Sequence, residues 1–410
     1  MKEKVIFAID LKSFFAFAEC VSRSLDPYKV PLAVADLSRG DSAMTLAATP
    51  YLKSLGVPSR SRVFLIPKNI KGLIFVPPRL DFYIEKSNEV IKVYEKFFSK
   101  DDIFVYSIDE VFINVTPYIS LYNKTPIELA NEVLKAITND TSLVAACGIG
   151  PNIFMAKIAM DTDSKHNTNN IAQWTYKDVP TKLWPLTPLS NVWSIGVKME
   201  KKLNNLGIYS VGDINKYDIN FYIKKFGVLG KELFLHFNGQ DSNTIETYKR
   251  KSKNPSTSIS QILYRDYNKD DIILIIREMC HVICSRVRKQ NIKTSCITFY
   301  LRYSRDLLEE FHASTSLSCP TNDEDEVLKE CLCIFNKYIK DLPIRKLGIR
   351  FSKLKYENYE QLNLFKNNEN TVLNKVIDNI NNKYGKSTVL LASSLLDYST
   401  IKERNKKQKI

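Results

Sequence analysis

The chain lacks long hydrophobic runs. No apolar stretch approaches the roughly 18 residues that a membrane-spanning helix needs, and the short apolar run in MKEKVIFAID stops at Asp10, too early for a secretory leader. We therefore expect a cytoplasmic protein without a membrane partner.

Cysteine and histidine are present, but not in the spacings that build metal or disulfide frameworks. The eight cysteines form no C-x-x-C pairs and have no histidine partners at zinc spacing, so neither a zinc ribbon nor a disulfide scaffold is expected. Cys280, His281 and Cys284 come closest to a metal motif. They lie in a segment with the apolar spacing of an amphipathic helix, so helix packing is favoured over metal binding.

Positive charge is what the sequence has in excess. Lysine and arginine number 59 against 45 aspartates and glutamates, giving a formal net charge of +14 over 410 residues. The length indicates several domains, and the 44% hydrophobic and 25% charged content is that of a globular protein. Basic residues occur in every segment, which fits a polyanionic partner such as nucleic acid, with a solvated basic surface as the simpler alternative.

The N-terminal quarter alternates between strand and helix patterns. Residues 4–10 are apolar and partly β-branched up to Asp10, which predicts a strand that ends at an acid, and helical spacing follows from Ser13. The same reasoning predicts strands at 28–36 and 71–78 and helices at 47–57 and 81–98.

Two neighbouring acids interrupt the otherwise apolar segment FVYSIDEVFINV at residues 104–115. In a straight strand, Asp109 and Glu110 would point to opposite faces of the sheet. A hairpin with SIDE at its tip instead brings both acids to one end of the sheet. Because Asp10 also ends a strand, we expect three carboxylates to converge there.

The following segments complete a recognisable order of elements. Helices are predicted at 126–138 and 152–165, with a strand between them at 142–150. Strand, helix, hairpin, helix and strand in this order predict a ferredoxin-like sheet with an insertion after its first strand.

Three carboxylates close together need a cation, because like charges raise each other's pKa. Oxygen ligands favour Mg²⁺ or Mn²⁺, and two such ions held by shared carboxylates are how polymerases stabilise the attacking and leaving oxygens of phosphoryl transfer. The alternative for Asp109 and Glu110 is a solvated hairpin tip without chemistry.

The C-terminal part contains two further modules. Residues 189–214 read as a helix, glycine-bounded turns and another helix, and the polar segment 241–254 reads as a linker. Residues 255–356 repeat a β-α-β-β-α-β pattern with an expected four strands and two helices. Residues 357–410 form a tail that is rich in asparagine and lysine and has a helical pattern from Lys366.

Three blocks of this sequence, IDLKSFFAFAEC (9–20), YSIDEVFINV (106–115) and ACGIGPNIFMAKIA (146–159), together resemble the Y-family translesion DNA polymerases. The likeness is greatest to their UmuC-like branch in Gram-positive bacteria and mobile elements, and it runs from about residue 4 to the C-terminus. It implies an α+β, multidomain right-hand polymerase with the following parts: a ferredoxin-like palm (1–12 and 79–168), small fingers (13–78), a helix-hairpin-helix thumb (169–240), a linker (241–254), a β-α-β-β-α-β little finger (255–356) and a tail (357–410).

The resemblance implies roles for the acids. Asp10, Asp109 and Glu110 correspond to the catalytic, metal-binding acids, and Leu11 to the position that lends a backbone carbonyl to a metal. The implied cofactor is a pair of Mg²⁺ ions, for which Mn²⁺ can substitute. Lys12 stands where some relatives carry an acid outside the triad.

The resemblance also implies a nucleotide pocket. Phe15 matches the aromatic steric gate, whose ring packs against the sugar and excludes a 2′-hydroxyl. Phe14 and Phe15 are both candidates for nucleotide binding. Helix core is the alternative for both, and it is our interpretation of Phe14.

Two lysines match residues that contact the incoming triphosphate. Lys53 is one, although Pro50, followed by Tyr51, stands where many relatives have a tyrosine. Lys165 is the other, in a loop one residue longer than in many relatives. Lys157, on the preceding helix, is the alternative and is interpreted as structural.

The DNA-binding parts are implied in the same way. Gly196 and Gly207 match the helix-hairpin-helix, where backbone amides meet a phosphate, and Ser194 replaces its first glycine. On the last little-finger strand, side chains at alternate positions could face a DNA backbone, or could simply be solvated. The candidate side chains on this strand are Arg345, Lys346, Arg350 and Lys353.

The segment QLNLF, residues 361–365, resembles the pentapeptide that binds the bacterial sliding clamp. Gln361 would contact the rim of the clamp pocket, and Leu362, Leu364 and Phe365 would fill its apolar part. Such short motifs recur by chance, but this one directly follows a little finger. For the rest of the tail, a recombinase filament is a partner suggested by analogy alone.

The sequence thus predicts an error-prone, DNA-templated DNA polymerase that extends a primer past damaged bases, with primer-template DNA and dNTP as substrates. No second acid-rich nuclease domain is visible, so proofreading is not expected. One alternative is a catalytically weak DNA- and clamp-binding accessory of the damage response, which the intact acids oppose. Another is a nucleotidyl cyclase, which would have no use for the DNA-binding modules.

Overall fold

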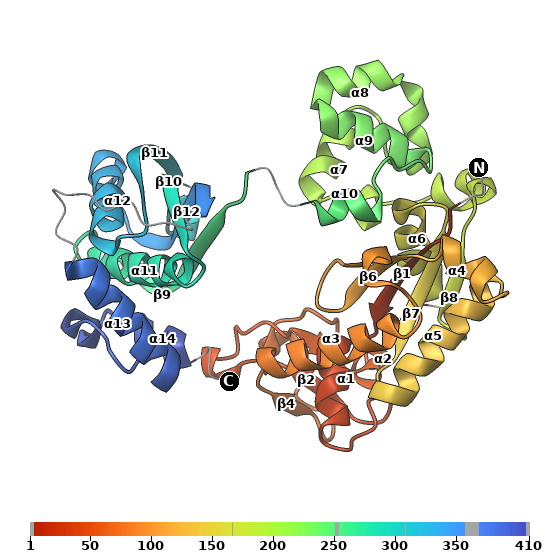
Figure 1. Cartoon of the computed structure of the whole chain (residues 1–410), viewed down its shortest axis with the longest axis horizontal. Helices are drawn as coiled ribbons and strands as arrows, with labels where there is room; N and C mark the ends of the chain where they lie inside the picture. The colour runs from red at the N-terminus through yellow and green to blue at the C-terminus, as the bar shows by residue number, and fades with distance from the viewer. Residues whose placement is uncertain (1–3, 166, 251–253, 308, 357–368, 407–410) are drawn as a thin grey trace. The chain divides into compact units, whose positions relative to one another are not determined.

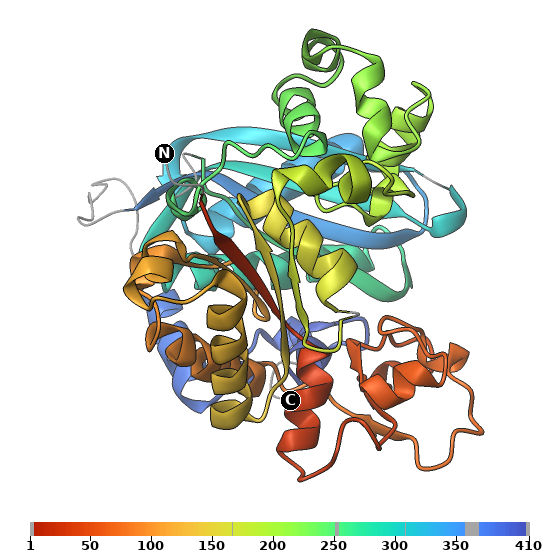
Figure 2. The same ribbon diagram turned by 90° about the vertical axis from the view of Figure 1, so that its right-hand side faces the viewer.

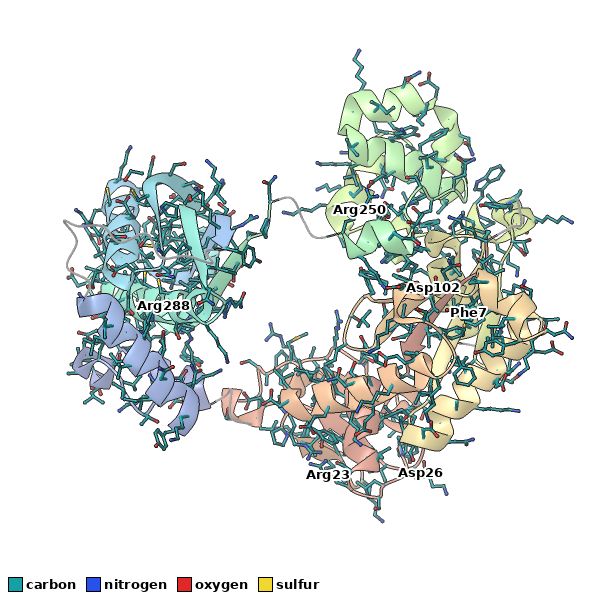
Figure 3. All side chains as sticks on the ribbon, in the orientation of Figure 1. Phe7, Arg23, Asp26, Asp102, Arg250 and Arg288 are labelled. Atoms are coloured by element: carbon teal, nitrogen blue, oxygen red, sulfur yellow. The ribbon has the colours of Figure 1, made fainter. Side chains whose placement is uncertain are left out.

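The computed structural model describes residues 4–165, 167–250, 254–307, 309–356 and 369–406 (Figure 1). The chain divides into two compact units, residues 1–250 and 251–410. Figure 3 shows the side chains of each unit, with Phe7 in the first and Arg288 in the second.

The first unit is built on a sheet whose strands lie in the order β5-β6-β1-β7-β8. Strand β1 pairs antiparallel with both β6 and β7, and β5 with β6, which confirms the ferredoxin-like order. Strand β8 adds a parallel partner to β7 that we did not expect, because it is only three residues long and follows a polar loop. The bounds are β1 Ile6–Leu11, β5 Ile103–Val105, β6 Glu110–Asn114, β7 Ala145–Gly150 and β8 Ile171–Gln173.

Helices cover both faces of this sheet, which is why β1 is apolar and buried along its whole length until Asp10. The core on one face includes side chains from α3 (Leu80–Glu95) and α5 (Pro126–Thr141). The other face carries α6 (Ile153–Ala159), and Figure 2 shows β1 in dark red between the helices of the two layers. Gly148 lets α6 approach, because a Cβ there would lie 2.1 Å from the carbonyl oxygen of Ala156.

The insertion after β1 forms helix α1 (Phe14–Val21) and a small sheet of order β3-β2-β4. Its elements are β2 Leu32–Val34, β3 Ala47–Ala48, α2 Pro50–Ser54 and β4 Ile74–Val76. The predicted helix at 47–57 is shorter than expected. Thr49 caps α2 by accepting a hydrogen bond from the Leu52 amide, so the two alanines before it are free to pair as a strand.

Residues after β8 form the helical module. It contains α7 Val197–Asn204, α8 Ile219–Phe226, α9 Val228–Phe237 and α10 Ile245–Lys249. The expected linker at 241–254 is therefore wrong for its first ten positions, which belong to the first unit. Its polar residues cap the backbone instead: Thr244 accepts from the Thr247 amide, while Ile245 is buried and Tyr248 stacks on Phe104.

The second unit confirms the β-α-β-β-α-β pattern. Its strands lie in the order β11-β10-β12-β9, all antiparallel, with α11 and α12 on one face. Because only one face is covered, buried and exposed residues alternate along the strands. The bounds are β9 Thr257–Tyr267, α11 Asp271–Arg288, β10 Ile292–Tyr303, β11 Glu310–Thr321, α12 Glu324–Tyr338 and β12 Ile344–Tyr356.

The described part of the tail packs against α11. It contains α13 Glu369–Tyr384 and α14 Ile401–Lys406. Arg288 donates from Nε to Asp378 of α13 at 2.7 Å, and the buried carboxylate of Glu278 accepts from the Thr400 amide at 3.1 Å. Residues 369–406 are thus part of the second unit.

The cysteine and histidine side chains of residues 280–284 take part in the packing of α11. Cys280 and Cys284 are buried in α11, and His281 bonds to Glu324, 2.8 Å away, so the helix interpretation of this motif is confirmed. Among the described helices, none is both long and apolar enough to cross a membrane.

Candidate active site

The pairing of β1 with β6 places two acids directly opposite each other. Asp10 of β1 and Glu110 of β6 are a register pair in the antiparallel ladder, so their side chains leave the same face of the sheet. Asp109 precedes Glu110 in the turn, and its carbonyl accepts from the Leu11 amide at 3.0 Å. The expected convergence of the three acids at one end of the sheet is therefore present, whereas their roles stay predictions.

Hydrogen bonds within SIDE hold the turn in shape. The amides of Tyr106 and Ser107 both donate to the Glu110 carbonyl, at 3.0 and 3.1 Å. The Ser107 hydroxyl donates to Asp109 Oδ1 at 2.6 Å and accepts from the Glu110 amide at 3.1 Å. The direction of the Asp109 carboxylate is thus fixed by its own turn.

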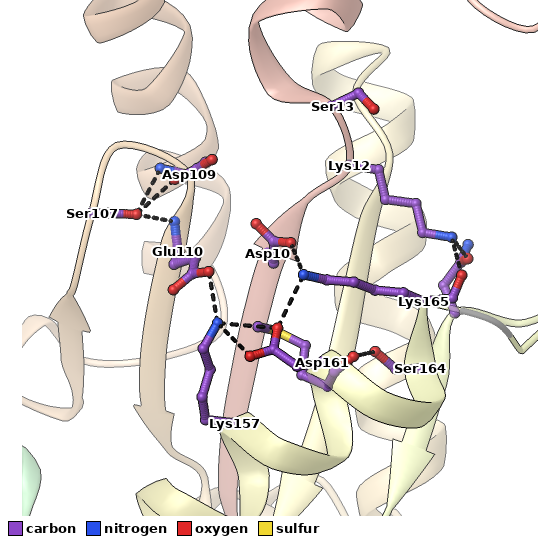
Figure 4. A network of polar contacts seen from close by, with 12 residues as sticks. Asp10, Lys12, Ser13, Ser107, Asp109, Glu110, Lys157, Asp161, Ser164 and Lys165 are labelled. Carbon is purple, nitrogen blue, oxygen red and sulfur yellow. Dashed lines mark hydrogen bonds and ion pairs between the residues drawn. The ribbon is translucent and has the colours of Figure 1, made fainter. Parts of the chain in front are cut away.

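Two lysines and a further acid connect Asp10 to Glu110 (Figure 4). Lys165 Nζ lies 2.7 Å from Asp10 and 3.0 Å from Asp161, and Lys157 Nζ lies 2.7 Å from Glu110 and 3.1 Å from Asp161. The result is a chain of alternating charges across the end of the sheet.

The sequence analysis did not identify Asp161 as part of the site, and it assigned Lys157 a purely structural role. The spacing in the sequence could have predicted this cluster. Charged residues stand at positions 157, 161 and 165, four residues apart, and so share one helical face. The Lys157 side chain is only 6% exposed, so its ammonium depends on these carboxylates for neutralisation.

Burial and charge perturb the titration of this cluster. The pKa of Asp10 is raised to about 6, mainly by burial and further by the charges of Glu110 and Asp109, while Lys165 partly offsets this rise. Burial lowers the pKa of Lys165, but Asp10 and Asp161 outweigh it, so this pKa lies above its ordinary value. The lysine therefore stays charged at neutral pH.

The acids fit a divalent cation by their chemistry, since all of their donor atoms are oxygens and the buried charge of Asp10 needs a counter-ion. In the described part of the chain, no three histidine, cysteine or acidic side chains are grouped closely enough to hold a metal as they stand. The ammonium groups of Lys157 and Lys165 pair with Glu110 and Asp10 instead. A bound metal would take over part of the neutralising role of these lysines.

The candidates for the nucleotide pocket differ in burial and in contacts. Phe14 is 3% exposed within the palm core, so its expected contact with nucleotide is corrected to the core alternative. Phe15 is half-buried and stacks on Tyr83, with ring centroids 4.2 Å apart. Lys53 Nζ lies 2.7 Å from Ser13 Oγ, and burial and the charge of Lys165 both lower its pKa.

The helix-hairpin-helix candidates lie at a helix start and in turns of the backbone. Gly196 directly precedes α7, whose first amides lack partners within the helix. Gly207 has φ +76°, and Ser194, in place of the family glycine, has φ +73°, a conformation that favours glycine. The serine therefore retains the turn at some conformational cost.

The charged residues of β12 do not all face the same way. Lys346 lies over the Tyr300 ring at 5.2 Å, and Arg350 donates to Ser256 at 3.0 Å. Buried residues 347, 349 and 351 alternate with them, so both lie on the open face of the sheet. Arg345 instead pairs with Asp266 at 3.3 Å, and Lys353 has φ +50°, which interrupts the alternation of the strand.

The open face also carries a residue that sequence reasoning missed. Arg302 of β10 is the register partner of Lys346, so it adds a third basic side chain to the Lys346 and Arg350 row. The alternation of apolar and polar residues in TSCITFYLRYSR could have predicted that Arg302 lies on this face.

The clamp candidates Gln361, Leu362, Leu364 and Phe365 lie outside the described residues.

Comparison with known proteins agrees with this architecture. The impB/mucB/samB family matches residues 9–161, its C-terminal domain matches 254–364, and the helix-hairpin-helix motif of the same family matches 176–208. The chain is 33% identical over 98% of its length to UvrX of Bacillus subtilis (strain 168), named for UV-damage repair, and covers 96% of that protein. It is 30% identical over 96% of its length to DNA polymerase IV 2 of the same organism, of which it covers 95%.

Among solved structures, a Y-family DNA polymerase chimera of Dbh and Dpo4 has the same fold, with a TM-score of 0.67 and 23% identity over 86% of this chain and 100% of the chimera. The family matches and the DNA polymerase IV relative, together with the palm sheet and the helix-hairpin-helix, define a DNA-directed DNA polymerase of the Y-family, the translesion class, whose chemistry uses divalent metal ions. The chain belongs to the impB/mucB/samB family of these enzymes.

Proposed function

We propose that this polymerase extends a primer past damaged template bases by two-metal nucleotidyl transfer at Asp10, Asp109 and Glu110. The observation that carries the proposal is the register pair of Asp10 and Glu110 with Asp109 in the adjoining turn. It joins carboxylates from two separate segments at one end of the sheet, which a solvated hairpin tip would not require.

The proposed reaction joins the 3′-oxygen of the primer to the α-phosphorus of a dNTP and releases pyrophosphate. The two Mg²⁺ ions, or Mn²⁺ in their place, would supply positive charge to the attacking and leaving oxygens. Asp10, Asp109, Glu110 and the Leu11 carbonyl would hold these ions.

The lysines of the site would have different roles. Lys165 is partly exposed and exchanges its Asp10 partner for the triphosphate, where Lys53 also makes contact. Lys157 is buried and stays with Asp161, which keeps the Glu110 strand end in place. Phe15 blocks the space of a 2′-hydroxyl, because Tyr83 fills the space behind its ring.

DNA would be held by two surfaces. The amides at the start of α7 would receive a phosphate, with Gly196 and Gly207 shaping the loop. The open face of the second unit would follow the phosphate backbone with Lys346 and Arg350.

Partners beyond the substrates form the last part of the proposal. The segment 361–365 would attach the enzyme to the bacterial sliding clamp. Residues 384–405 are the candidate contact for a recombinase filament, and the protein would work in the cytoplasm.

Primer extension on a template with an abasic site tests the proposed function. With Mg²⁺ and all four dNTPs, we expect the purified protein to insert opposite and beyond the lesion, and we expect Asp109→Ala to be inactive on damaged and undamaged templates alike. Synthesis that proceeds on undamaged DNA but always stops one base before the lesion would contradict the translesion assignment.

A further inference from the structure

A fully buried carboxylate lies one helical turn beyond the steric-gate candidate. Glu19, on α1, is 0% exposed. It accepts from Arg79 Nε at 2.9 Å, from Arg79 Nη2 at 2.7 Å and from the Tyr83 hydroxyl at 2.7 Å, and it also pairs with Arg23. Because a buried ion pair often adds no net stability over apolar packing, such a network calls for another explanation.

Tyr83 contacts both the gate candidate Phe15 and the buried acid Glu19 of α1. Phe15 and Glu19 are four residues apart and therefore share one face of that helix. The fully buried Tyr83 ring stacks on Phe15 with 4.2 Å between centroids and 13° between planes, while its hydroxyl bonds to Glu19. Arg79 and Tyr83 both lie at the start of α3. The contacts of these two side chains therefore hold the Glu19 face of α1 against one end of α3.

We propose that Tyr83, held by Glu19 and Arg79, is a positioning residue that sets how strictly the enzyme excludes ribonucleotides. This inference rests on the proposed gate role of Phe15. A gate ring discriminates only if it cannot retreat from a 2′-hydroxyl, and close packing behind the ring removes the room to do so. The Tyr83 ring occupies that room, and the Glu19 network stops Tyr83 itself from shifting.

A purely structural role for Tyr83 makes a different prediction. If the residue only stabilised the core, its loss would lower the stability of the protein and affect dNTP and rNTP insertion equally. If it fixes the gate, its loss lowers the ratio of dNTP to rNTP insertion, because only the ribonucleotide benefits from the extra room.

The test measures kcat/KM for matched dNTP and rNTP insertion by the full-length protein. We expect Tyr83→Leu to reduce the dNTP preference roughly 10-fold or more, the scale on which small steric changes in a pocket alter selectivity. Tyr83→Phe keeps the stacked ring but loses the hydroxyl that Glu19 holds, so its dNTP preference should lie between those of Tyr83→Leu and the wild type. Tyr94→Leu is the matched control, because Tyr94 is a buried tyrosine of the same helix and core.

Each outcome decides the inference. A drop in discrimination for Tyr83→Leu, with Tyr94→Leu at the wild-type ratio and a similar loss of melting temperature, supports it. Equal losses for dNTP and rNTP in Tyr83→Leu overturn it. Phe15→Ala is run in parallel: if even this variant keeps the wild-type ratio, the gate assignment itself fails, and the role of Tyr83 fails with it.

Discussion

Lys165 Nζ lies 2.7 Å from Asp10 Oδ2, so a side chain proposed to hold the triphosphate is paired with a side chain proposed to hold metal. The same ammonium contacts Asp161, which also contacts Lys157, and Lys157 contacts Glu110. Part of the negative charge of the acids is thus offset before any cation enters. Metal binding at Asp10 and the release of Lys165 toward a phosphate would favour each other.

Replacing Lys165 tests this exchange. We expect Lys165→Met to bind Mn²⁺ more tightly than the wild type in the absence of nucleotide, because a competing positive charge beside Asp10 is gone. KM for dNTP should rise roughly tenfold, since a hydrogen bond to a charged group contributes about 1.5–3 kcal/mol. Mn²⁺ titration by electron paramagnetic resonance and steady-state kinetics give the two quantities.

Lys182→Met is the control, because Lys182 pairs with Asp178 at 3.3 Å and contacts none of the three acids. It should leave both quantities unchanged. Weaker Mn²⁺ binding in Lys165→Met would show that Lys165 does not compete with the metal.

The open face of the second unit, which we propose binds DNA, gives a prediction about salt. Lys346→Ala and Arg350→Ala should each weaken primer-template binding and lower the slope of log affinity against log salt by about 0.9, the value for one lost phosphate contact. Arg345→Ala should change the slope little, because Arg345 already pairs with Asp266. Fluorescence anisotropy over a salt series measures the slopes, and a larger effect of Arg345→Ala than of the other two would reverse our assignment of the face.

The contact between His281 and Glu324 predicts a pH dependence of stability. The hydrogen bond to Glu324 is the main cause that raises the pKa of His281 above its ordinary 6.5, against the lowering effect of burial. Asp378 adds to the rise and Arg288 opposes it. A folded-state pKa above the unfolded value means that this stabilisation is complete below pH 6.5 and is lost as the pH rises through the folded-state pKa.

Chemical denaturation from pH 6 to pH 9 measures this dependence. We expect the wild type to lose stability over this range and His281→Gln to lose less of it. His312→Gln, at an exposed histidine of β11, is the control and should follow the wild type. Identical pH profiles for His281→Gln and the wild type would remove the contribution of His281.

The proposed clamp-binding segment, residues 361–365, gives a separate prediction. Replacing Leu364 and Phe365 together by alanine should erase stimulation of synthesis by the sliding clamp, because the apolar part of the motif is gone. Synthesis without the clamp should be unchanged. Primer extension with and without loaded clamp measures both, and full stimulation of the double variant would rule the motif out.

The sequence allowed the meeting of the acids to be predicted, because it depends on local rules. Asp10 ends an apolar strand and Asp109–Glu110 interrupt another, and a tight turn at SIDE was the arrangement that could place both acids at one end of a sheet. The core position of Phe14 followed in the same way from the helical spacing around it.

Other features depend on contacts between distant segments and could not be predicted in that way. The stacking of Tyr83 on Phe15 joins residues of separate helices, and no local pattern reports it. The segment around Asp241 looked like a linker because its polar side chains, which cap backbone amides, resemble those of a solvated loop. The docking of residues 369–406 depends on Arg288 and Glu278, whose partners lie about 90 to 120 residues further along the chain.

The most direct test of the account is single-turnover primer extension by Glu110→Gln, with primer-template affinity measured on the same preparation. Glutamine keeps the size of the side chain and removes the charge that we propose holds the metal. We expect the rate of extension to fall at least roughly 100-fold, the scale for removing a preorganised electrostatic contact to the reacting groups. Affinity for primer-template should stay within a few-fold of the wild type.

Glu132→Gln, at a surface carboxylate of α5 paired with Lys124, controls for the substitution itself and should be fully active. A Glu110→Gln protein that extends primers at the wild-type rate would contradict the assignment of the metal site to this pair of strands.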